Sequence, residues 1–292
     1  MRLINRARRK VGLPVKKKPK PPSRRLMMEA MLPLGHRAGN NDDEEWVRTA
    51  LRTAPGYPLI DGPNYLDVLS AMHRIDKPDW YLEIGTETGR SLSLCPGNFV
   101  SIDPEYKLEP YSYMHGTKGF FFQQTSDDFF DSGFLARNDI QPSLGFLDGL
   151  HWVEFLLRDF LNFEKQAAPG AVAILHDCLP SNPIMAIRDH PAAMAQGGLW
   201  AGDVWKTLMI LIKARPDLTF DVIDAYPTGL AVISGLNPDA DQKRDAVEAE
   251  AEALKDVEIE DFGIDAYYSH FEIQSGYEFI KQRETLTNAK ES

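Results

Sequence analysis

Five short apolar runs, separated by turn residues or helical patterns, constrain the fold of this chain more than any other feature. Each run has the length of a buried strand. The runs are Trp80 to Ile84, Phe99 to Ile102, Phe120 to Gln123, Leu144 to Leu147 and Val172 to Leu175. The clearest helix between them is Trp152 to Phe163, where apolar side chains recur at helical spacing. This alternation predicts an α/β fold, a parallel sheet with helices on both faces.

The last third of the chain changes this pattern. Leu218 to Ile223 and Gly229 to Ile233 are two further predicted strands, with Tyr226 to Thr228 at the turn between them. So short a connection permits only an antiparallel pair. A helix is expected between Asp203, its N-cap, and Pro216. We therefore predict a Rossmann-like, seven-stranded, mostly parallel sheet with a C-terminal antiparallel hairpin.

Charge divides the chain into three predicted segments. Residues 1–26 hold 11 of the 32 Lys and Arg residues and no acid, whereas the whole chain has 43 acidic residues. A body this acidic does not suit a nucleic-acid groove. We expect residues 1–26 to be a disordered basic tail, 40–238 to be the main domain with N-terminal helices, and 239–292 to be an acidic helical extension without chemistry. The tail is expected to be a solvated, solubilising arm, and contact with an anionic membrane, with RNA or with an acidic protein partner is the alternative.

The cysteine content and the apolar runs indicate the cellular location that we expect for the protein. Two cysteines, Cys95 and Cys178, exclude a disulfide scaffold and a Cys-rich zinc site. No run approaches the roughly 18 apolar residues of a membrane span, and no signal-peptide pattern is visible. The expected location is cytoplasmic, with peripheral binding at the inner membrane surface left open by the basic tail. The oligomeric state is also left open.

A carboxylate and a glycine turn end the first predicted strand, at Glu83, Gly85 and Gly89. A glycine has no Cβ, so Gly85 permits a sharp turn and the close approach of a ligand. A helix starting at Ser91 would present free N–H groups at the carboxyl edge of the sheet, where ligands bind in such folds. The dinucleotide pattern fits poorly, because Glu87 replaces a glycine and would repel a pyrophosphate. This turn favours a ligand with an amine, and a tight turn without a ligand is the alternative.

Polar residues also end the other four runs. They are Asp103 after the second, Ser126 and Asp127 after the third, Asp148 and His151 after the fourth, and His176 and Asp177 after the fifth. A carboxylate at Asp103 can accept both hydroxyls of a ribose, and Ser126 or Asp127 can reach an adenine edge. Each residue alone is more often a cap or turn residue. Five strands that deliver polar groups to one edge predict a binding site.

The ordered set Glu83-x-Gly85-x-x-x-Gly89, Asp103, Asp127 and Asp148-Gly149-x-His151 resembles a class I S-adenosylmethionine-dependent methyltransferase. The resemblance covers about residues 60–235. It is closest to the bacterial branch related to macrocin-type sugar O-methyltransferases and catechol-type O-methyltransferases. It implies S-adenosylmethionine as the cofactor, with the acid after the first strand facing its ammonium group. The implied cofactor-binding residues are Glu83, Gly85, Thr86, Gly89, Ser91, Asp103, Ser126, Asp127 and Asp148.

Several of these relatives hold a divalent metal, and the resemblance implies Asp148, His176 and Asp177 as its ligands here. The candidate metals are Mg²⁺, Mn²⁺ and Fe²⁺. A histidine ligand suits Mn, Fe or Zn at least as well as Mg²⁺, and a His176 that only hydrogen-bonds a ligand is the alternative. Leu150 stands where the sugar enzymes have an acid. His151 occupies the position of the catalytic lysine of catechol-type enzymes and is the candidate base. A structural histidine bonded to a neighbouring carbonyl is the alternative.

The implied function is O-methylation of a small hydroxylated acceptor, a sugar or glycan precursor, by in-line transfer with or without metal assistance. Leu179 to Gly202 is expected to form a lid over the acceptor, with Trp200, Asp203 and Trp205 nearby. Lys206 is either a helix-surface charge or a contact for an anionic acceptor. Two alternatives remain. One is a cephalosporin-hydroxylase-like, metal-dependent oxygenase on the same fold, and the other is a non-catalytic cofactor-binding scaffold tethered by the tail.

Overall fold

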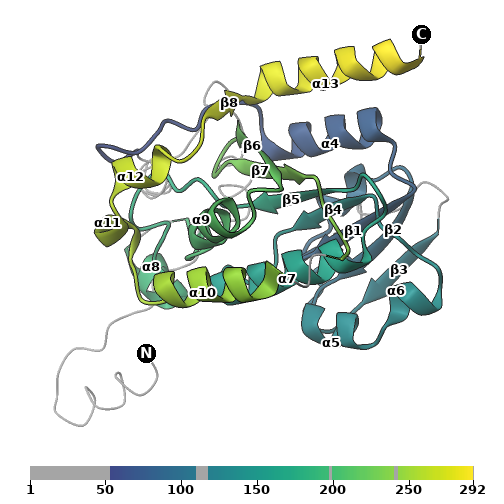
Figure 1. Cartoon of the computed structure of the whole chain (residues 1–292), viewed down its shortest axis with the longest axis horizontal. Coiled ribbons are helices and arrows are strands. Elements are labelled where there is room, and N and C mark those ends of the chain that lie inside the picture. Colours follow the sequence, from purple (N-terminus) through teal and green to yellow (C-terminus); the bar gives the residue numbers. More distant parts are fainter. Residues whose placement is uncertain (1–52, 110–117, 197–198, 240–242, 292) are drawn as a thin grey trace.

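The computed structural model describes residues 53–109, 118–196, 199–239 and 243–291, so the predicted basic tail lies outside the described residues. One sheet organises this part of the chain (Figure 1). Its strands are β1 (Trp80–Ile84), β2 (Asn98–Ile102), β3 (Gly119–Phe122), β4 (Leu144–Leu147), β5 (Val172–His176), β6 (Thr219–Asp224), β7 (Leu230–Ser234) and β8 (Ile273–Ser275). The helices are α4 (Tyr65–Asp76), the 3-10 helix η2 (Leu92–Leu94), α5 (Ser126–Asp131), α6 (Phe134–Arg137), α7 (Val153–Gln166), α8 (His190–Ala195), α9 (Trp205–Ala214), α10 (Arg244–Leu254), α11 (Ile259–Phe262), α12 (Ile264–Tyr268) and α13 (Gly276–Glu291).

The strand order is β3-β2-β1-β4-β5-β7-β6-β8. Strands β1 to β5 pair in parallel, and β7 runs antiparallel to both β5 and β6. The Rossmann-like, mostly parallel sheet with a C-terminal antiparallel hairpin is therefore confirmed. The sheet also has an eighth strand, because β8 pairs in parallel with β6 at the edge. Its three residues are too few to show an alternating pattern in the sequence.

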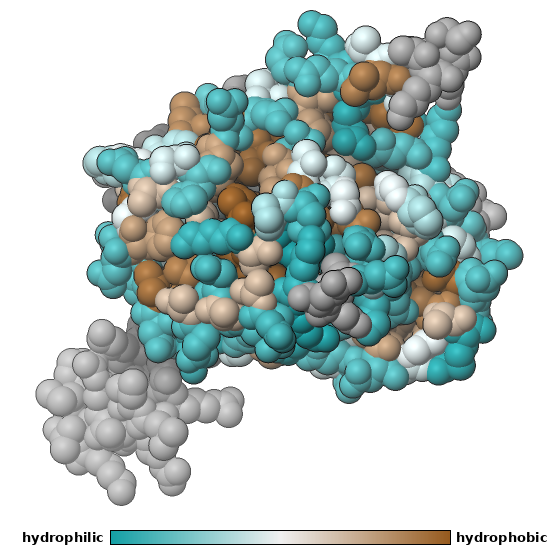
Figure 2. Space-filling model, viewed as in Figure 1, coloured by the Kyte–Doolittle hydropathy of each residue, from teal (hydrophilic) through white to brown (hydrophobic). Residues whose placement is uncertain are grey.

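Two apolar cores cover the two faces of the sheet. Tyr81 of β1 belongs to the core beneath α4, whereas Leu82 belongs to the core that contains residues of α7 and α9. A strand that is buried on both faces consists almost entirely of apolar residues. Such strands can therefore be recognised in the sequence as apolar runs. In Figure 1, α4 and α13 lie above the sheet and α7 and α10 lie below it. The face in Figure 2 mixes hydrophilic and hydrophobic residues, as is usual for a surface in contact with water.

The turn after β1 differs from the expected helix start. Ser91 is followed by η2, a single 3-10 turn, and not by an α-helix. Pro96 and Gly97 come directly after it, and both residue types oppose the continuation of a helix. The expected row of free helical N–H groups is therefore absent from this turn.

The C-terminal segment packs against the rest of the chain. Phe279 of α13 is buried against the core beneath α4, and Arg283 pairs with Asp76 of α4 at 2.9 Å. Tyr267 of α12 is fully buried. Within the described residues, no helix is both long enough and apolar enough to cross a membrane.

Candidate active site

The glycine turn after β1 lies directly against the turn after β4. Gly85 has φ +85°, and a Cβ placed on it would lie 1.9 Å from the carbonyl oxygen of Asp148. Gly89 also has a positive φ, +78°. Only a glycine fits the first position, because any side chain would overlap the neighbouring backbone. The carboxyl ends of β1 and β4 are therefore in direct contact.

Glu83 lies beneath this turn in a shell of hydroxyl groups. Its side chain accepts hydrogen bonds from Tyr81 Oη at 2.6 Å and Ser91 Oγ at 3.1 Å. Burial raises the pKa of Glu83 to about 7, against the opposing effect of the hydroxyls of Tyr81, Thr86 and Ser91. Thr86 also bonds Ser101 on β2. Glu83 is fully buried, so it can act on a ligand only through the backbone and hydroxyls that it holds.

Asp103, at the end of β2, is hydrogen-bonded to the glycine turn. One carboxylate oxygen accepts the backbone N–H of Glu87 at 2.7 Å, and the other accepts that of Glu105 at 2.7 Å. Each oxygen keeps a further acceptor position. The structure thus brings Asp103 beside the turn, as a ribose-binding carboxylate requires.

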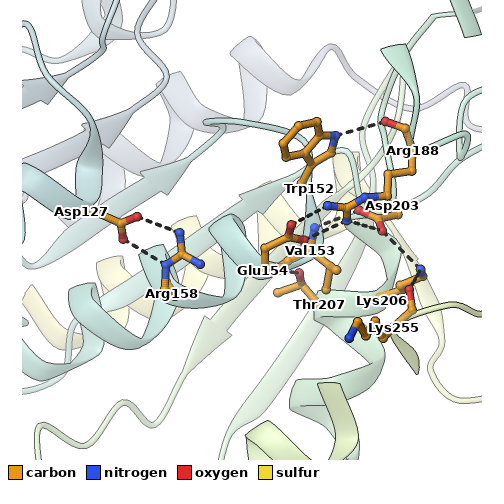
Figure 3. Close-up of polar contacts among 10 residues, drawn as sticks. All are labelled: Asp127, Trp152, Val153, Glu154, Arg158, Arg188, Asp203, Lys206, Thr207 and Lys255. Atoms are coloured by element: carbon orange, nitrogen blue, oxygen red, sulfur yellow. Dashed lines mark hydrogen bonds and ion pairs between the residues drawn. The ribbon is translucent and has the colours of Figure 1, made fainter. Parts of the chain in front are cut away.

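Ser126 and Asp127 begin α5, but Thr125 is the residue that caps this helix. Both oxygens of Asp127 accept hydrogen bonds from Arg158 of α7, at 3.0 and 2.7 Å (Figure 3). This guanidinium holds the pKa of Asp127 below its usual range. Ser126 bonds the buried carboxyl of Asp159. A role for either residue at an adenine edge stays a prediction, and the Asp127 carboxylate is already engaged by an ion pair.

Asp148, His151 and Asp177 offer ligand atoms that lie within 4.8 Å of one another. His151 Nε2 is 3.4 Å from Asp148 Oδ1, and His151 Nδ1 is 3.2 Å from Asp177 Oδ2. His176 Nδ1 is 3.1 Å from Asp148 Oδ1 and 3.2 Å from Asp177 Oδ1. The three predicted metal ligands are therefore in contact, and the candidate base His151 lies among them.

Opposite charges control the pKa values in this cluster. Burial alone would lower the pKa of His151, but the carboxylates of Asp177 and Asp148 raise it to about 9. The same carboxylates raise the pKa of His176 well above its usual value, although His176 is also buried. Burial would raise the pKa of Asp177, yet the two imidazoles hold it well below its usual range. The cluster is therefore a set of buried and half-buried groups whose opposite charges stabilise one another.

The donor set fits a divalent cation. Two carboxylates and an imidazole are a common ligand set for Mn²⁺, Fe²⁺ and Zn²⁺. His176 also has a buried Nε2 without a hydrogen-bond partner, so its orientation is set by Nδ1 and the two carboxylates. The ring of Tyr65 on α4 lies 4.4 Å from that of His176. Either histidine can complete the set, and His151 is the one that forms the compact group with both carboxylates.

Asp203 and Lys206 have structural roles that the sequence did not indicate. Asp203 is not the N-cap of α9, which is Val204, but accepts the backbone N–H of Val153 at the start of α7 at 2.9 Å. Lys206 is buried and donates to Asp203 at 3.2 Å and to the carbonyl of Lys255 at 3.1 Å (Figure 3). Lys206 is therefore neither a surface charge nor a free contact for an acceptor.

Arg188 links the segment that follows β5 to the N-terminus of α7 through ion pairs and a ring contact. Its guanidinium bonds Glu154 at 2.8 Å and Asp203 at 2.9 Å, and it lies over the ring of Trp152. The indole N–H of Trp152 donates to the Arg188 carbonyl at 3.1 Å (Figure 3). The described part of this segment is thus held to the start of α7 by ion pairs and a cation–π contact; its role as a lid stays a prediction.

Trp200, near the end of this segment, lies against the candidate base. Its ring is stacked on that of His151 with 5.0 Å between the centroids, and its carbonyl lies 2.9 Å from His151 Nδ1. Its indole N–H donates to the carbonyl of Ile187 at 2.7 Å. Trp205, by contrast, is buried and packs against Tyr267. Trp200 therefore borders the candidate site, and Trp205 belongs to the core.

The sequence did not single out Thr228, whose hydroxyl donates to Asp177 Oδ1. A signal for it existed, because Thr228 lies in the hairpin turn next to β7, and β7 pairs with β5. The antiparallel register returns that turn to the end of β5. Arg158 was visible only as a polar position on a helix, and its partner Asp127 could not be identified from spacing.

The strand order from β3 to β6, with antiparallel β7, is that of the class I methyltransferase fold that the resemblance implied. No family model and no curated protein matches the chain. Solved structures with a similar fold include the O-methyltransferase TomG from Streptomyces achromogenes in complex with SAM, at 21% identity, 58% of this chain, 78% of that chain and a TM-score of 0.43. An O-methyltransferase from Bacillus cereus in complex with SAH has 14% identity, 80% and 96% coverage and a TM-score of 0.41.

Proposed function

We propose that this chain is an S-adenosylmethionine-dependent O-methyltransferase that acts on a small hydroxylated acceptor, a sugar or glycan precursor. The contact between Gly85 and the carbonyl of Asp148 carries the proposal. Because the two turns touch, a ligand seated on the glycine turn lies beside the cluster of Asp148, His151 and Asp177. The cofactor side and the acceptor side of a methyl transfer thus share one sheet edge.

The cofactor side is formed by the ends of β1 and β2. Asp103 offers carboxylate lone pairs to the ribose, while its bonds to Glu87 and Glu105 hold it in place. Thr86, Gly89 and Ser91 belong to the proposed contact surface for the amino-acid end, supported from below by Glu83. Positioning matters most here, because the sulfonium already activates the methyl group.

The acceptor side is formed by the ends of β4 and β5. We assign Asp148, His176 and Asp177 to hold a divalent cation, which leaves His151 for proton transfer. Such a cation would lower the pKa of an acceptor hydroxyl. His151 is the more accessible histidine, with 23% of its side chain exposed against 8% for His176. His151 is therefore the proton acceptor in this proposal.

The charge state of His151 supports a coupling between cation and base. Asp177 and Asp148 raise its pKa to about 9, so the ring is protonated at neutral pH and compensates the carboxylates. A cation that compensated them instead would remove the cause of the increase. His151 then returns toward its ordinary pKa near 6.5, where an imidazole accepts a proton efficiently.

The test of the cofactor side is calorimetric titration with S-adenosylmethionine and S-adenosylhomocysteine. The wild type is expected to bind at micromolar concentration. Asp103→Ala is expected to bind at least about tenfold more weakly, because it loses the ribose contact and two bonds that order the turn. Asp131→Ala, an exposed acid of α5, is the matched control and should bind like the wild type. Equal binding by Asp103→Ala would reject the assigned contact.

One observation keeps a second enzyme class open. Both His151 and His176 contact both carboxylates, and two histidines with a carboxylate also suit non-haem iron. We therefore retain a cephalosporin-hydroxylase-like oxygenase as the alternative. Purification with stoichiometric iron and consumption of dioxygen in the presence of an acceptor would favour it. Methyl transfer from S-adenosylmethionine without dioxygen consumption would exclude it.

A further inference from the structure

Asp177 adopts a backbone conformation that needs support from its surroundings. Its φ is +61°, in the left-handed region that residues other than glycine rarely occupy. The free energy of such a conformation is unfavourable by about as much as one hydrogen bond stabilises a protein. It therefore persists only where neighbouring contacts hold it. Asp177 is also 6% exposed and carries one of the carboxylates of the candidate cation site. The contacts that hold this backbone therefore determine where the carboxylate points.

The peptide unit between Cys178 and Leu179 forms hydrogen bonds through both its carbonyl and its N–H group. The N–H of Leu179 donates to the carbonyl of Thr228 at 2.7 Å. The carbonyl of Cys178, in the same peptide unit, accepts the hydroxyl of Tyr267 at 2.6 Å. Thr228 also bonds the Asp177 carboxylate directly. One side of this clamp belongs to the hairpin of the sheet, and the other belongs to the C-terminal extension.

The hydroxyl of Tyr267 is itself placed by a rigid environment. Tyr267 is fully buried, and its ring contacts those of Trp205 at 5.4 Å and Phe271 at 5.2 Å between centroids. An aromatic ring packed in this way has little rotational freedom, so its hydroxyl presents a fixed donor. The neighbouring Tyr268 donates to the carbonyl of Pro180 at 2.6 Å. The two tyrosines thus hold carbonyls one and three residues after Asp177.

We infer that Tyr267 is a positioning residue of the candidate active site, which fixes Asp177 through the Cys178 carbonyl. The inference rests on the proposed function for the meaning of that site. It assigns the segment after residue 239 a part in the chemistry, although this segment lies outside the resemblance. Tyr267 touches neither acceptor nor cofactor in this assignment, and it acts only through the backbone after β5.

The experiment compares Tyr267→Phe with Tyr268→Phe in the full chain. Each variant keeps its ring and loses one hydroxyl bond of the same length, and the half-buried Tyr268 is the neighbouring control for the fully buried Tyr267. The first readout is the imidazole ¹H–¹⁵N spectrum of His151 and His176 without metal at a fixed pH. Because both rings contact Asp177, their signals should move in Tyr267→Phe and stay near wild type in Tyr268→Phe. Thermal melting checks that both variants are folded.

The second readout is the affinity for Mn²⁺. Loss of a group that orients a metal ligand typically lowers affinity 10- to 100-fold, so Tyr267→Phe is expected to bind Mn²⁺ about tenfold more weakly. Tyr268→Phe should stay within about twofold of wild type. Unchanged histidine signals in Tyr267→Phe, or equal changes in both variants, would overturn the inference. If the wild type binds no Mn²⁺, the cation proposal fails, while the imidazole spectra still decide the role of Tyr267.

Discussion

Glu83 and Asp177 are two buried carboxyl groups at the same edge of the sheet, yet their pKa values are shifted in opposite directions. Glu83 is surrounded by the hydroxyls of Tyr81, Thr86 and Ser91, and burial raises its pKa to about 7. Asp177 faces His151 and His176, which hold its pKa well below its usual range. Burial is nearly the same for both groups and raises the pKa of each, so the difference between them comes from their neighbours.

The difference assigns distinct chemistry to the two ends of the site. Hydroxyl neighbours satisfy a carboxyl group without adding charge, so the β1 side can receive a ligand that brings its own charges. Imidazole neighbours compensate the carboxylates of the β4 and β5 side, and a divalent cation can replace that compensation. In the proposed function, this edge of the sheet holds the nucleoside on the side lined by hydroxyls and the cation on the side with the two imidazoles.

The largest expected effect belongs to Asp177→Asn. Asparagine tolerates a positive φ, so the backbone is retained while the charge between the two imidazoles is removed. Affinity for Mn²⁺ should fall about 1,000-fold, which corresponds to about 4 kcal/mol. Glu83→Gln, the matched change on the hydroxyl-lined side, should leave Mn²⁺ affinity within about twofold. Equal losses in the two titrations would remove the distinction between the sides.

The next effect concerns the pH dependence of stability. The folded pKa of Glu83 is about 7, above its ordinary value of 4.5. Between these values the unfolded chain loses this proton and the folded chain keeps it, so the contribution of Glu83 to stability falls as pH rises from 4.5 through 7. Removing this group should make the unfolding free energy of Glu83→Gln rise relative to wild type by about 3 kcal/mol over that interval.

Denaturant unfolding of both proteins at several pH values checks this prediction. The difference between the two curves isolates Glu83, because every other titrating group is common to both proteins. Parallel curves would show that Glu83 is ionised in the folded chain. In that case, the two sides would have the same electrostatic character.

A third carboxylate on this edge should give the smallest effect. Asp127 is about 40% exposed, and its partner Arg158 is about 38% exposed. Exposed ion pairs contribute about 0–1 kcal/mol, so Arg158→Gln should lower stability by less than about 1 kcal/mol. Its affinity for S-adenosylhomocysteine should stay within about threefold of wild type. A loss of tenfold or more in titration would instead show that this pair orients the adenine side.

The sequence predicted the positions of these groups because strand ends are easily recognised. Apolar runs located β1 to β5, and the parallel arrangement then required Glu83, Asp103, Asp148 and Asp177 to share one edge. The short link before β7 likewise required an antiparallel pair. These features depend on local pattern and on the geometry of a parallel sheet, which the sequence contains directly.

Side-chain partners could not be predicted in the same way. The bond between Tyr267 and Cys178 spans 89 positions, and the pairs of Asp127 with Arg158 and Thr228 with Asp177 also join separate elements. Spacing carries no information on such contacts. The burial of Lys206 was also not predictable, since one of its two acceptors is a carbonyl 49 residues away and its spacing from Asp203 gives no sign of burial.

We propose that one sheet edge holds a nucleoside at Asp103 and, separately, a cation at Asp177. Crossed titrations of two variants with S-adenosylhomocysteine and Mn²⁺ test it most directly. We predict that Asp103→Ala loses the nucleoside and keeps Mn²⁺, and that Asp177→Asn loses Mn²⁺ and keeps the nucleoside. A wild type that binds neither ligand, or variants that lose both together, would contradict the account.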